Sequence, residues 1–538
     1  KMNNNYDYII VGAGSAGCAV ANRLSKNHQN NVLLIEAGRA SHPVTRLPAS
    51  FALLIDNPLA NWRYRSEPEE STGNREIPVP RGKLLGGSSA INGLVYVRGN
   101  KLDYDTWAQM GNTGWSYDDV LPFFKKMENY QGELSEIRGG DGPLKVSEVT
   151  DRNPIYDGLF KAAEENKIPV NKDYNGDDQE GISYTQTTIY KGERMSAKIA
   201  YLSPIKSRKN LTIVTNTHIS KVVFEESKAI GVECIQGKGK SNQTILANKE
   251  VILSAGAISS PQILQLSGIG DDKHLSELGI KTIHNNPSVG KNLQDHLQVR
   301  MVYKTNTRTL NDELNTWWKK GLIGLQYMLF RTGPLTLSAS QVFAFTNTSL
   351  DGSRPNIQFH MQPLSADKPG DGVHPFSAFT MSICNLRPES RGEVSIKSSD
   401  PQSLPTIIPN YLATDSDRQI AIDSIKVARK IAMANAIKDH ILDEFVPGSS
   451  FASDEDLLEV AKNHSQSIYH PVGTCKMGHD KESVVDDRLR VHGVDNLRVV
   501  DASIMPELVS GNTNAPTMMI AEKAAEMILD DNNSSLTK

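Results

Sequence analysis

Long apolar runs and an excess of one charge are both missing from this 538-residue chain. No window holds about 18 uninterrupted apolar residues, the length that a membrane-spanning helix requires. Lysine and arginine total 58 against 62 aspartate and glutamate, and the resulting net charge of −4 gives no electrostatic footprint for nucleic acid. We therefore expect no transmembrane segment and no nucleic-acid partner.

Cysteine is scarce as well, and its spacing excludes the usual disulfide and zinc frameworks. The four cysteines are Cys18, Cys234, Cys384 and Cys475. They are far apart and form no C-x-x-C pair, which favours a reduced protein in the cytoplasm. His464, His470 and Cys475 match no common zinc spacing, so we expect no metal and interpret Cys475 as a small buried residue. A short polar lead runs directly into the first strand, so we expect no signal peptide.

What the chain does contain, at its start, is a strand, a glycine-rich turn and a helix in immediate succession. The apolar run Tyr8–Val11 leads into the G-x-G-x-x-G sequence of residues 12–17, and residues 18–24 have helical spacing. A second apolar run, residues 31–36, ends in Glu36. This order of strand, turn, helix, strand and acid is typical of an adenine dinucleotide site.

Each part of this motif has a physical role. Gly12 allows the tight turn, Gly14 lets a pyrophosphate approach the backbone, and Gly17 lets the helix pack closely on the strand. The helix N-terminus offers unpaired N–H groups to phosphate, and Glu36 can accept a hydrogen bond from a ribose hydroxyl. By itself the motif leaves both FAD and NAD open.

The rest of the chain falls into two regions with different patterns of predicted helices and strands. Residues 81–93 are dense in glycine and serine, residues 211–235 alternate as antiparallel strands do, and residues 249–257 repeat the strand-and-small-turn pattern before a helix at 260–266. From about 300 to 460, alternating strands at 356–360 and 393–397 accompany a helix near 415–434, and the chain ends in a helix over 517–529. Trp107 and Trp115 read as core aromatics of a helical stretch over 101–130.

One apolar segment has no clear place in this scheme. Residues 321–330 are preceded by Trp317-Trp318-Lys319-Lys320 and followed by Arg331. The segment is too short to span a bilayer. We interpret it as a core helix, or alternatively as part of a lid or of a membrane-facing lip that allows peripheral membrane contact.

Four signatures in fixed order make the chain resemble the glucose–methanol–choline (GMC) oxidoreductases over nearly its full length, in texture closest to their bacterial choline dehydrogenase-like and alcohol dehydrogenase members. They are the N-terminal fingerprint, the run Arg81–Gly93, the run Gly256–Gly270, and a C-terminal pair formed by Tyr469–Gly478 and by Asp501–Ser503 leading to Gly511–Thr517. The resemblance implies that the cofactor is FAD. It also implies an α/β fold (α+β overall), in which a Rossmann-like FAD-binding domain is interleaved with an antiparallel-sheet substrate domain.

The resemblance further implies domain boundaries and cofactor contacts. The FAD-binding domain would comprise 1–155, 205–300 and 462–538, and the substrate domain 156–204 and 301–461. The residues expected to contact FAD are Gly12, Gly14, Ser15, Ala16, Gly17, Glu36, Ala37, Gly87, Ser88, Asn92, Gly93, Leu94, Val95, Val222, Ala255, Asp501, Ala502, Asn514 and Thr517. Val222 would lie on the adenine side. The position that carries a covalently attached flavin in some relatives is Ile91 here, and isoleucine has no nucleophilic nitrogen, so we expect non-covalent FAD.

Two residues are expected to carry the chemistry. Oxidation of an alcohol removes a proton from oxygen and a hydride from carbon, so a flavin enzyme needs a base and a positioning group. His470 matches the active-site histidine of the family, and Asn514 is assigned to its second catalytic position. We expect His470 to accept the hydroxyl proton while Asn514 hydrogen-bonds the alcohol oxygen.

The substrate is expected to be a neutral primary alcohol. Choline would need a carboxylate and aromatic rings for its cation. Trp317, Trp318 and Tyr469 could supply rings, but Gln298 stands where choline-oxidising relatives carry a glutamate. Choline oxidation stays as an alternative, as does a redox-inactive flavin-binding protein of the same fold. The electron acceptor is expected to be O2 or a quinone-type carrier.

Overall fold

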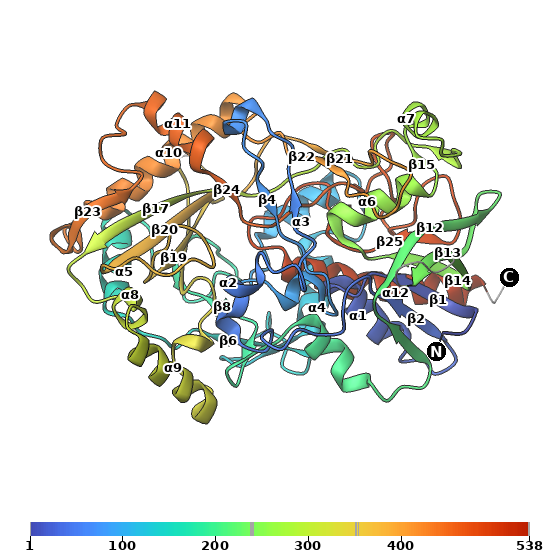
Figure 1. Ribbon diagram of the computed structural model, residues 1–538, viewed down its shortest axis with the longest axis horizontal. Coiled ribbons are helices and arrows are strands. Elements are labelled where there is room, and N and C mark those ends of the chain that lie inside the picture. The colour runs from blue at the N-terminus through green and yellow to red at the C-terminus, as the bar shows by residue number, and fades with distance from the viewer. Residues whose placement is uncertain (1, 237–241, 350–351, 353, 536–538) are drawn as a thin grey trace.

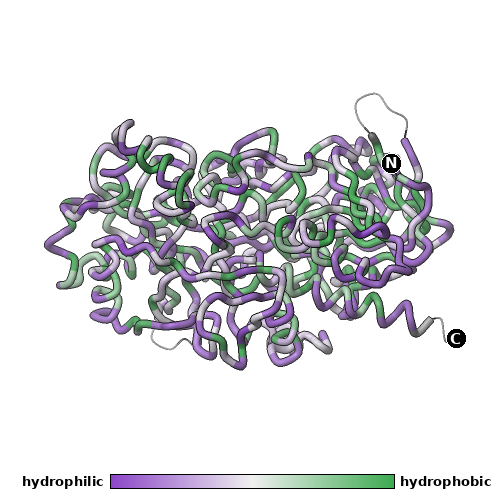
Figure 2. The backbone as a smooth tube through the Cα atoms, turned by 90° about the horizontal axis from the view of Figure 1, so that it is seen from below, coloured by the Kyte–Doolittle hydropathy of each residue, from purple (hydrophilic) through white to green (hydrophobic). Residues whose placement is uncertain are grey.

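The computed structural model describes residues 2–236, 242–349, 352 and 354–535, and it contains two large sheets toward opposite ends of an elongated molecule (Figure 1). Both chain termini lie at the end that carries the first sheet (Figures 1 and 2). The mixed α/β fold, with one large sheet that has a parallel centre and one large antiparallel sheet, confirms the predicted fold class.

The first sheet has a parallel centre that continues into an antiparallel meander. Its order is β11-β2-β1-β14-β13-β12, and β25 pairs with the end of β14. Strands β11, β2, β1, β14 and β25 run parallel, whereas β12, β13 and β14 are antiparallel neighbours. The strands are β1 (Asn5–Val11), β2 (Val32–Ile35), β11 (Leu211–Val214), β12 (Thr217–Glu225), β13 (Lys228–Gln236), β14 (Asn242–Leu253) and β25 (Leu497–Val499). The antiparallel prediction for 211–235 therefore holds for β12 and β13 and is wrong for β11.

Three helices flank this sheet next to its glycine-rich turns. They are α1 (Ser15–Leu24), α6 (Gly256–Leu266) and α12 (Asn514–Ser535). Helices α1 and α12 pack together, and Arg23 donates two hydrogen bonds of 2.9 and 2.8 Å to the Glu522 carboxylate. All three helices begin three or four residues before the predicted starts, because their first turns consist mainly of small or polar residues that precede the apolar periodicity.

The second sheet is antiparallel, with the order β23-β17-β20-β19-β18-β7 and β24 paired to β17. Its strands are β7 (Gly181–Tyr184), β17 (Leu297–Thr305), β18 (Val342–Thr346), β19 (Ile357–Gln362), β20 (Ala378–Asn385), β23 (Ile441–Val446) and β24 (Gln466–Ser467). Helices α5 (Pro154–Glu165), α10 (Asp415–Ala432) and α11 (Asp454–His464) share one hydrophobic core with it. Because side chains alternate along a strand, Val299 and Met301 of β17 join this core while Gln298 and Arg300 face a cavity.

The predicted domain division stays a prediction, and two boundary elements bear on it. Strand β24 and the start of β17 belong to the second sheet, although their residues fall in segments assigned to the first domain.

The strand predicted at 393–397 is β21 (Glu393–Ser395), which pairs with β22 (Thr406–Ile408) outside the second sheet.

The predicted burial of tryptophan side chains is confirmed for one pair and wrong for another. Trp107 of α3 (Lys101–Gln109) and Trp115, just before α4 (Tyr117–Met127), are fully buried, as predicted. Trp317 and Trp318 begin α9 (Trp317–Phe330), and both are exposed, so the core interpretation of this segment is wrong. Within the described residues, no helix combines the length and apolarity needed to cross a bilayer.

Candidate functional site

A cavity of about 360 Å³ lies between the glycine-rich turns of the first sheet and the polar face of the second. Of the residues predicted to bind cofactor or substrate, those that line it are Gly12, Gly14, Ser15, Ala16, Glu36, Ala37, Gly87, Ser88, Asn92, Gly93, Leu94, Val95, Ala255, Asp501, Ala502, Asn514, Thr517, Gln298, Tyr469 and His470. Segments from the whole length of the chain therefore meet in one place. Gly17, Val222, Trp317 and Trp318 are not part of its wall.

The first glycine turn is shaped by close approaches of backbone to backbone. Gly12 has a φ of +99°, which side chains disfavour. A Cβ on Gly17 would lie 1.8 Å from the Gly12 carbonyl oxygen, which explains why this helical position has no side chain. Gly14 precedes α1 and makes no side-chain cap, so the first N–H groups of the helix are available to a ligand in the cavity.

Glu36 occupies the far end of this turn as a buried carboxylate. Its Oε2 accepts from the Ala13 N–H at 3.0 Å and its Oε1 from the Gly38 N–H at 2.9 Å. Burial raises its pKa to about 7, while these two backbone hydrogen bonds oppose the increase. Glu36 therefore both fixes the turn and presents an acceptor to the cavity.

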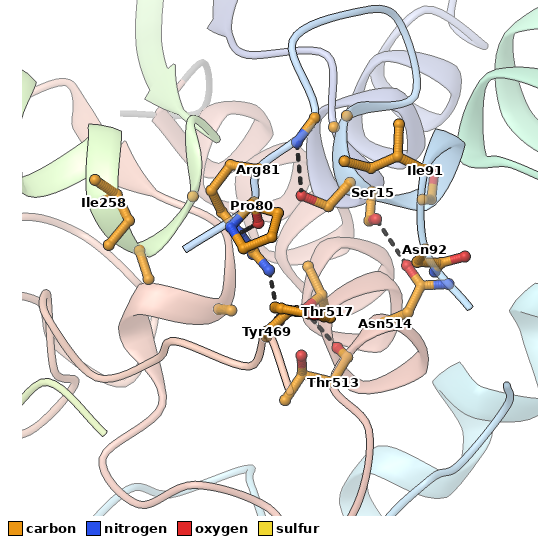
Figure 3. Close-up of a pocket in the computed structure, with 18 of the residues that line it drawn as sticks. Ser15, Pro80, Arg81, Ile91, Asn92, Ile258, Tyr469, Thr513, Asn514 and Thr517 are labelled. Atoms are coloured by element: carbon orange, nitrogen blue, oxygen red, sulfur yellow. Dashed lines mark hydrogen bonds between the residues drawn. The ribbon is translucent and has the colours of Figure 1, made fainter. Parts of the chain in front are cut away.

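A second glycine turn lies directly against the first. A Cβ on Gly87 would approach the Cα of Gly14 to 2.5 Å, so no side chain fits at this position. The residues that follow the turn, Ile91 and Asn92, line the cavity and point into the same region as Ser15 (Figure 3). Arg194 donates from its Nη1 to the Asn92 carbonyl at 2.8 Å and holds this stretch in place.

His470 is held from two sides by the consecutive residues Asp295 and His296. The Asp295 carboxylate accepts the His470 backbone N–H at 2.8 Å and is itself held by the hydroxyls of Ser467 and Tyr411. The ring nitrogens Nδ1 of His296 and Nδ1 of His470 are 2.8 Å apart, and the two rings are perpendicular. The residue before His470, Tyr469, has a φ of +74°, a strained conformation that directs the chain into the cavity.

These contacts determine which nitrogen of His470 carries its proton. Burial lowers the pKa of His296 to about 4 and lowers the pKa of His470 well below its ordinary value, so both rings are neutral at pH 7. Nε2 of His296 lies 2.8 Å from the Leu386 carbonyl, which only accepts, so it must be protonated and its Nδ1 must be an acceptor. His470 therefore donates from Nδ1, and its Nε2 is unprotonated and acts as an acceptor.

The residue beside that nitrogen is Asn512, whereas the sequence assigned the positioning role to Asn514. Asn512 Nδ2 lies 3.2 Å from His470 Nε2, and its Oδ1 accepts from Gln358 Nε2 at 3.2 Å, which fixes the amide. Asn514, the first residue of α12, instead accepts a 2.7 Å hydrogen bond from the Ser15 hydroxyl (Figure 3). The two asparagines are separated because α12 begins between them, which turns Asn514 toward α1.

Three other predicted residues lie elsewhere than expected. Val222 is buried in β12, where its N–H donates to the Ser267 hydroxyl at 2.8 Å, and the cavity wall is formed earlier in that strand by Thr217, His218 and Ile219. Trp317 and Trp318 are exposed on α9 and outside the cavity wall, so they form no aromatic box there.

The residues present fit FAD. The cavity connects Glu36 and the uncapped end of α1, which suit a ribose and a pyrophosphate, with the His470–Asn512 pair. The two glycine turns leave room where a Cβ on Gly14 would meet only Gly87 Cα, at 3.8 Å. Within the described residues, no group of three or more His, Cys, Asp or Glu side chains is arranged to hold a metal ion.

Ile91 leads to a prediction about how the flavin is retained. Because its side chain is aliphatic and borders the cavity, no covalent bond to the flavin can form at this position. Acid precipitation of the FAD-loaded protein is expected to release essentially all of the yellow colour into the supernatant. Flavin fluorescence that stays with the pellet, or with the band on a denaturing gel, would contradict this.

Comparison with known proteins agrees with this geometry. The family model described as GMC oxidoreductase matches in two parts, an N-terminal one over residues 6–298 and a C-terminal one over residues 388–521. The chain is 44% identical to an alcohol dehydrogenase [acceptor] of Pseudomonas putida, covering 97% of this chain and 96% of the relative. It is 40% identical to oxygen-dependent choline dehydrogenases of Escherichia coli, covering 97% and 95%. The crystal structure of pyridoxine 4-oxidase from Mesorbium loti superposes with a TM-score of 0.87 at 30% identity, covering 97% and 99%.

Proposed function

The chain belongs to the GMC oxidoreductases, an FAD-dependent family of enzymes that oxidise CH–OH groups, and within it we propose that this enzyme converts a neutral primary alcohol to the aldehyde. The observation that carries the proposal is the unprotonated Nε2 of His470 beside the amide of Asn512, at the wall of the cavity. A base and a hydrogen-bond donor 3.2 Å apart can both reach one alcohol oxygen.

Four residues around the cavity have separate roles in this reaction. His470 Nε2 accepts the hydroxyl proton. Asn512 Nδ2 lies 3.2 Å from this nitrogen and carries two hydrogens, so it donates to the alcohol oxygen between them and sets its angle. His296 keeps the His470 proton on Nδ1, and Asp295 keeps the backbone of His470 in place. Bound FAD supplies the acceptor for the hydride, at its N5 atom.

The charges around the cavity argue against choline. The carboxylates among the described residues of its wall are Glu36 and Asp501. Asp501 accepts from the Gly256 N–H at 2.9 Å and from the Ser260 hydroxyl at 2.6 Å, and Glu36 is engaged by the first glycine turn. On the substrate side stand the neutral Gln298 and the cation Arg300. A quaternary ammonium would therefore find no counter-charge, and Arg300 would repel it.

The experiment that tests this function is anaerobic reduction of the FAD-loaded enzyme by a panel of compounds. Primary aliphatic and benzylic alcohols are expected to bleach the flavin absorbance, and choline is expected to bleach it at least about 100-fold more slowly at equal concentration. Preferred bleaching by choline would overturn the substrate assignment. No bleaching by any alcohol would favour the redox-inactive alternative. Oxygen consumption compared with artificial-dye reduction then distinguishes O2 from a quinone-type acceptor.

The low pKa of His470 predicts an unusual pH profile. The base works in its neutral form, which predominates above its pKa, and burial places that pKa well below the ordinary value. We therefore expect kcat/KM to change less than about twofold between pH 8 and pH 6.5, and to fall with about unit slope only in more acidic solution. Initial rates in buffers of constant ionic strength measure this. An acidic limb with its midpoint near or above 6.5 would contradict it.

The two asparagines are separable by mutation. Asn512→Ala removes the donor to the alcohol oxygen and is expected to lower the rate of flavin reduction about 100-fold with unchanged FAD content. Asn514→Ala breaks the contact with Ser15 and is expected to lower FAD retention, while the FAD-loaded fraction is reduced within about threefold of the parent rate. Stopped-flow absorbance and the flavin-to-protein ratio distinguish the two variants, and an exchange of the two results would restore the assignment to Asn514.

A further inference from the structure

Helix α9 carries an unusual concentration of exposed apolar side chains. It forms part of the lower edge of the molecule in Figure 1, away from both termini. Trp317 is 84% exposed, Met328 73% and Leu329 64%, and Trp318, Leu322, Leu325 and Phe330 are also exposed. The described residue of the helix that is buried is Tyr327, whose hydroxyl donates to the Gly192 carbonyl at 3.1 Å. Exposed apolar patches of this kind mark an interaction surface.

These side chains lie on one face of the helix. At 100° per residue, the positions of Trp317, Trp318, Leu322, Leu325, Met328 and Leu329 fall within an arc of about 140°. Gly321 is the other residue in this arc, so no polar or charged side chain interrupts it. We call this set of six apolar residues the α9 face.

The charged residues within α9 and directly after it are all basic. Lys319 and Lys320 lie on the remaining arc and Arg331 follows the last residue, while the segment from 314 to 349 contains no aspartate or glutamate. Arg331 pairs with Glu193 at 3.8 Å, whereas within the described residues neither Lys319 nor Lys320 forms an ion pair. This local excess of positive charge is opposite in sign to the chain as a whole, whose net charge is −4.

We propose that the α9 face docks the protein onto a lipid bilayer with anionic headgroups. With 14 residues α9 is too short to span the hydrocarbon, so it would lie in the plane of the interface with its apolar arc inserted. Tryptophan rings suit the headgroup level, and lysines beside an apolar face attract anionic lipid. The surface therefore matches a bilayer in length, apolarity and charge.

Docking would bring one wall of the cavity near the membrane. After α9 the chain passes through a short helical turn, η6 (Pro334–Thr336), to Ala339, which lines the cavity and donates its N–H to the Gly93 carbonyl at 3.0 Å. The η6 turn packs against η1 (Pro48–Ser50), which leads directly into the cavity-lining Phe51. An apolar alcohol or electron carrier dissolved in the bilayer would thus reach the cavity over a short distance.

The test is flotation of the FAD-loaded enzyme with large vesicles of phosphatidylcholine containing about 30% phosphatidylglycerol, compared with pure phosphatidylcholine vesicles. The parent protein is expected to float with the anionic vesicles, and less so at high salt. Lys319→Glu combined with Lys320→Glu is expected to weaken this binding at least about tenfold. Met328→Gln combined with Leu329→Gln is expected to weaken it at both salt concentrations.

The matched control lies on a different surface. Met433 and Leu442 are 70% and 65% exposed, so Met433→Gln combined with Leu442→Gln removes the same residue types at nearly equal exposure, and binding should be unchanged. All variants are expected to reduce flavin with a water-soluble alcohol at the parent rate, which shows that they fold. Failure of the parent to bind anionic vesicles, or equal loss in the control, would overturn the proposal. A concentration-dependent dimer that Met328→Gln with Leu329→Gln converts to monomer, without vesicle binding, would assign the α9 face to a second copy instead.

Discussion

Replacement of His470 by glutamine is expected to lower the rate of flavin reduction by the alcohol about 10³-fold, while the protein keeps its FAD. The amide preserves size and a hydrogen-bond donor for His296, but it cannot accept a proton at the place of Nε2. Because the base acts only in the transition state, the loss should appear in the limiting rate of reduction and leave the dissociation constant of the alcohol within a few-fold. Anaerobic stopped-flow absorbance separates these two quantities.

The matched control is His218→Gln. His218 also lines the cavity, and burial lowers its pKa as well, but its Nε2 lies 2.8 Å from the Pro401 carbonyl, away from Asn512. This variant should reduce its flavin within about threefold of the parent rate. If His470→Gln behaved like His218→Gln, the assignment of His470 as the base would be wrong. An equal and large loss in both variants would mean that any change in the cavity wall is harmful, and the comparison would again not support a specific base.

The parts of the site that the sequence predicted are those with local signatures. The turn at Gly12–Gly17, the acid Glu36 and the run Gly87–Gly93 are recognisable because their function requires glycine, or an acid, at fixed spacing along a short stretch. His470 was recognisable through the residues around it. In each case the signal lies within a segment of about 20 residues, which is the range over which spacing alone constrains geometry.

The parts that the sequence missed depend on contacts between distant segments. His296 and Asp295 contact His470 although they are separated from it by 174 and 175 positions in the sequence. The periodicity of neither segment predicts that contact. Asn512 and Asn514 were indistinguishable because the choice depends on where α12 begins, and helix starts with small residues carry little apolar signal. Trp317 and Trp318 were mispredicted for a related reason. An apolar segment predicts that its side chains are covered, but the sequence does not say whether they are covered by the rest of the protein or by another molecule.

Gly14→Ala is expected to produce a folded protein that has lost its FAD. Gly14 has φ −85° and ψ −159°, which alanine adopts without strain, and the added Cβ would meet nothing closer than Gly87 Cα at 3.8 Å. The methyl group would instead occupy the space in front of the α1 N-terminus where a pyrophosphate must approach the backbone. We expect FAD affinity to fall about 100-fold or more, measured by titrating the apoprotein while following flavin fluorescence, with little change in the melting temperature of the apoprotein.

Two further variants make this result specific. Gly17→Ala puts a Cβ 1.8 Å from the Gly12 carbonyl oxygen, so it should lower the melting temperature of the apoprotein as well as FAD binding, because the clash is within the protein. A Cβ on Gly372 would meet no atom within 4 Å, and Gly372→Ala should change neither property. Gly14→Ala protein that binds FAD within about threefold of the parent would show that the pyrophosphate does not approach the α1 N-terminus. The distinction between the two glycines rests on the closest approach of an added Cβ, which is 3.8 Å at Gly14 and 1.8 Å at Gly17. A Gly14→Ala protein that loses both its fold and its FAD would contradict this distinction.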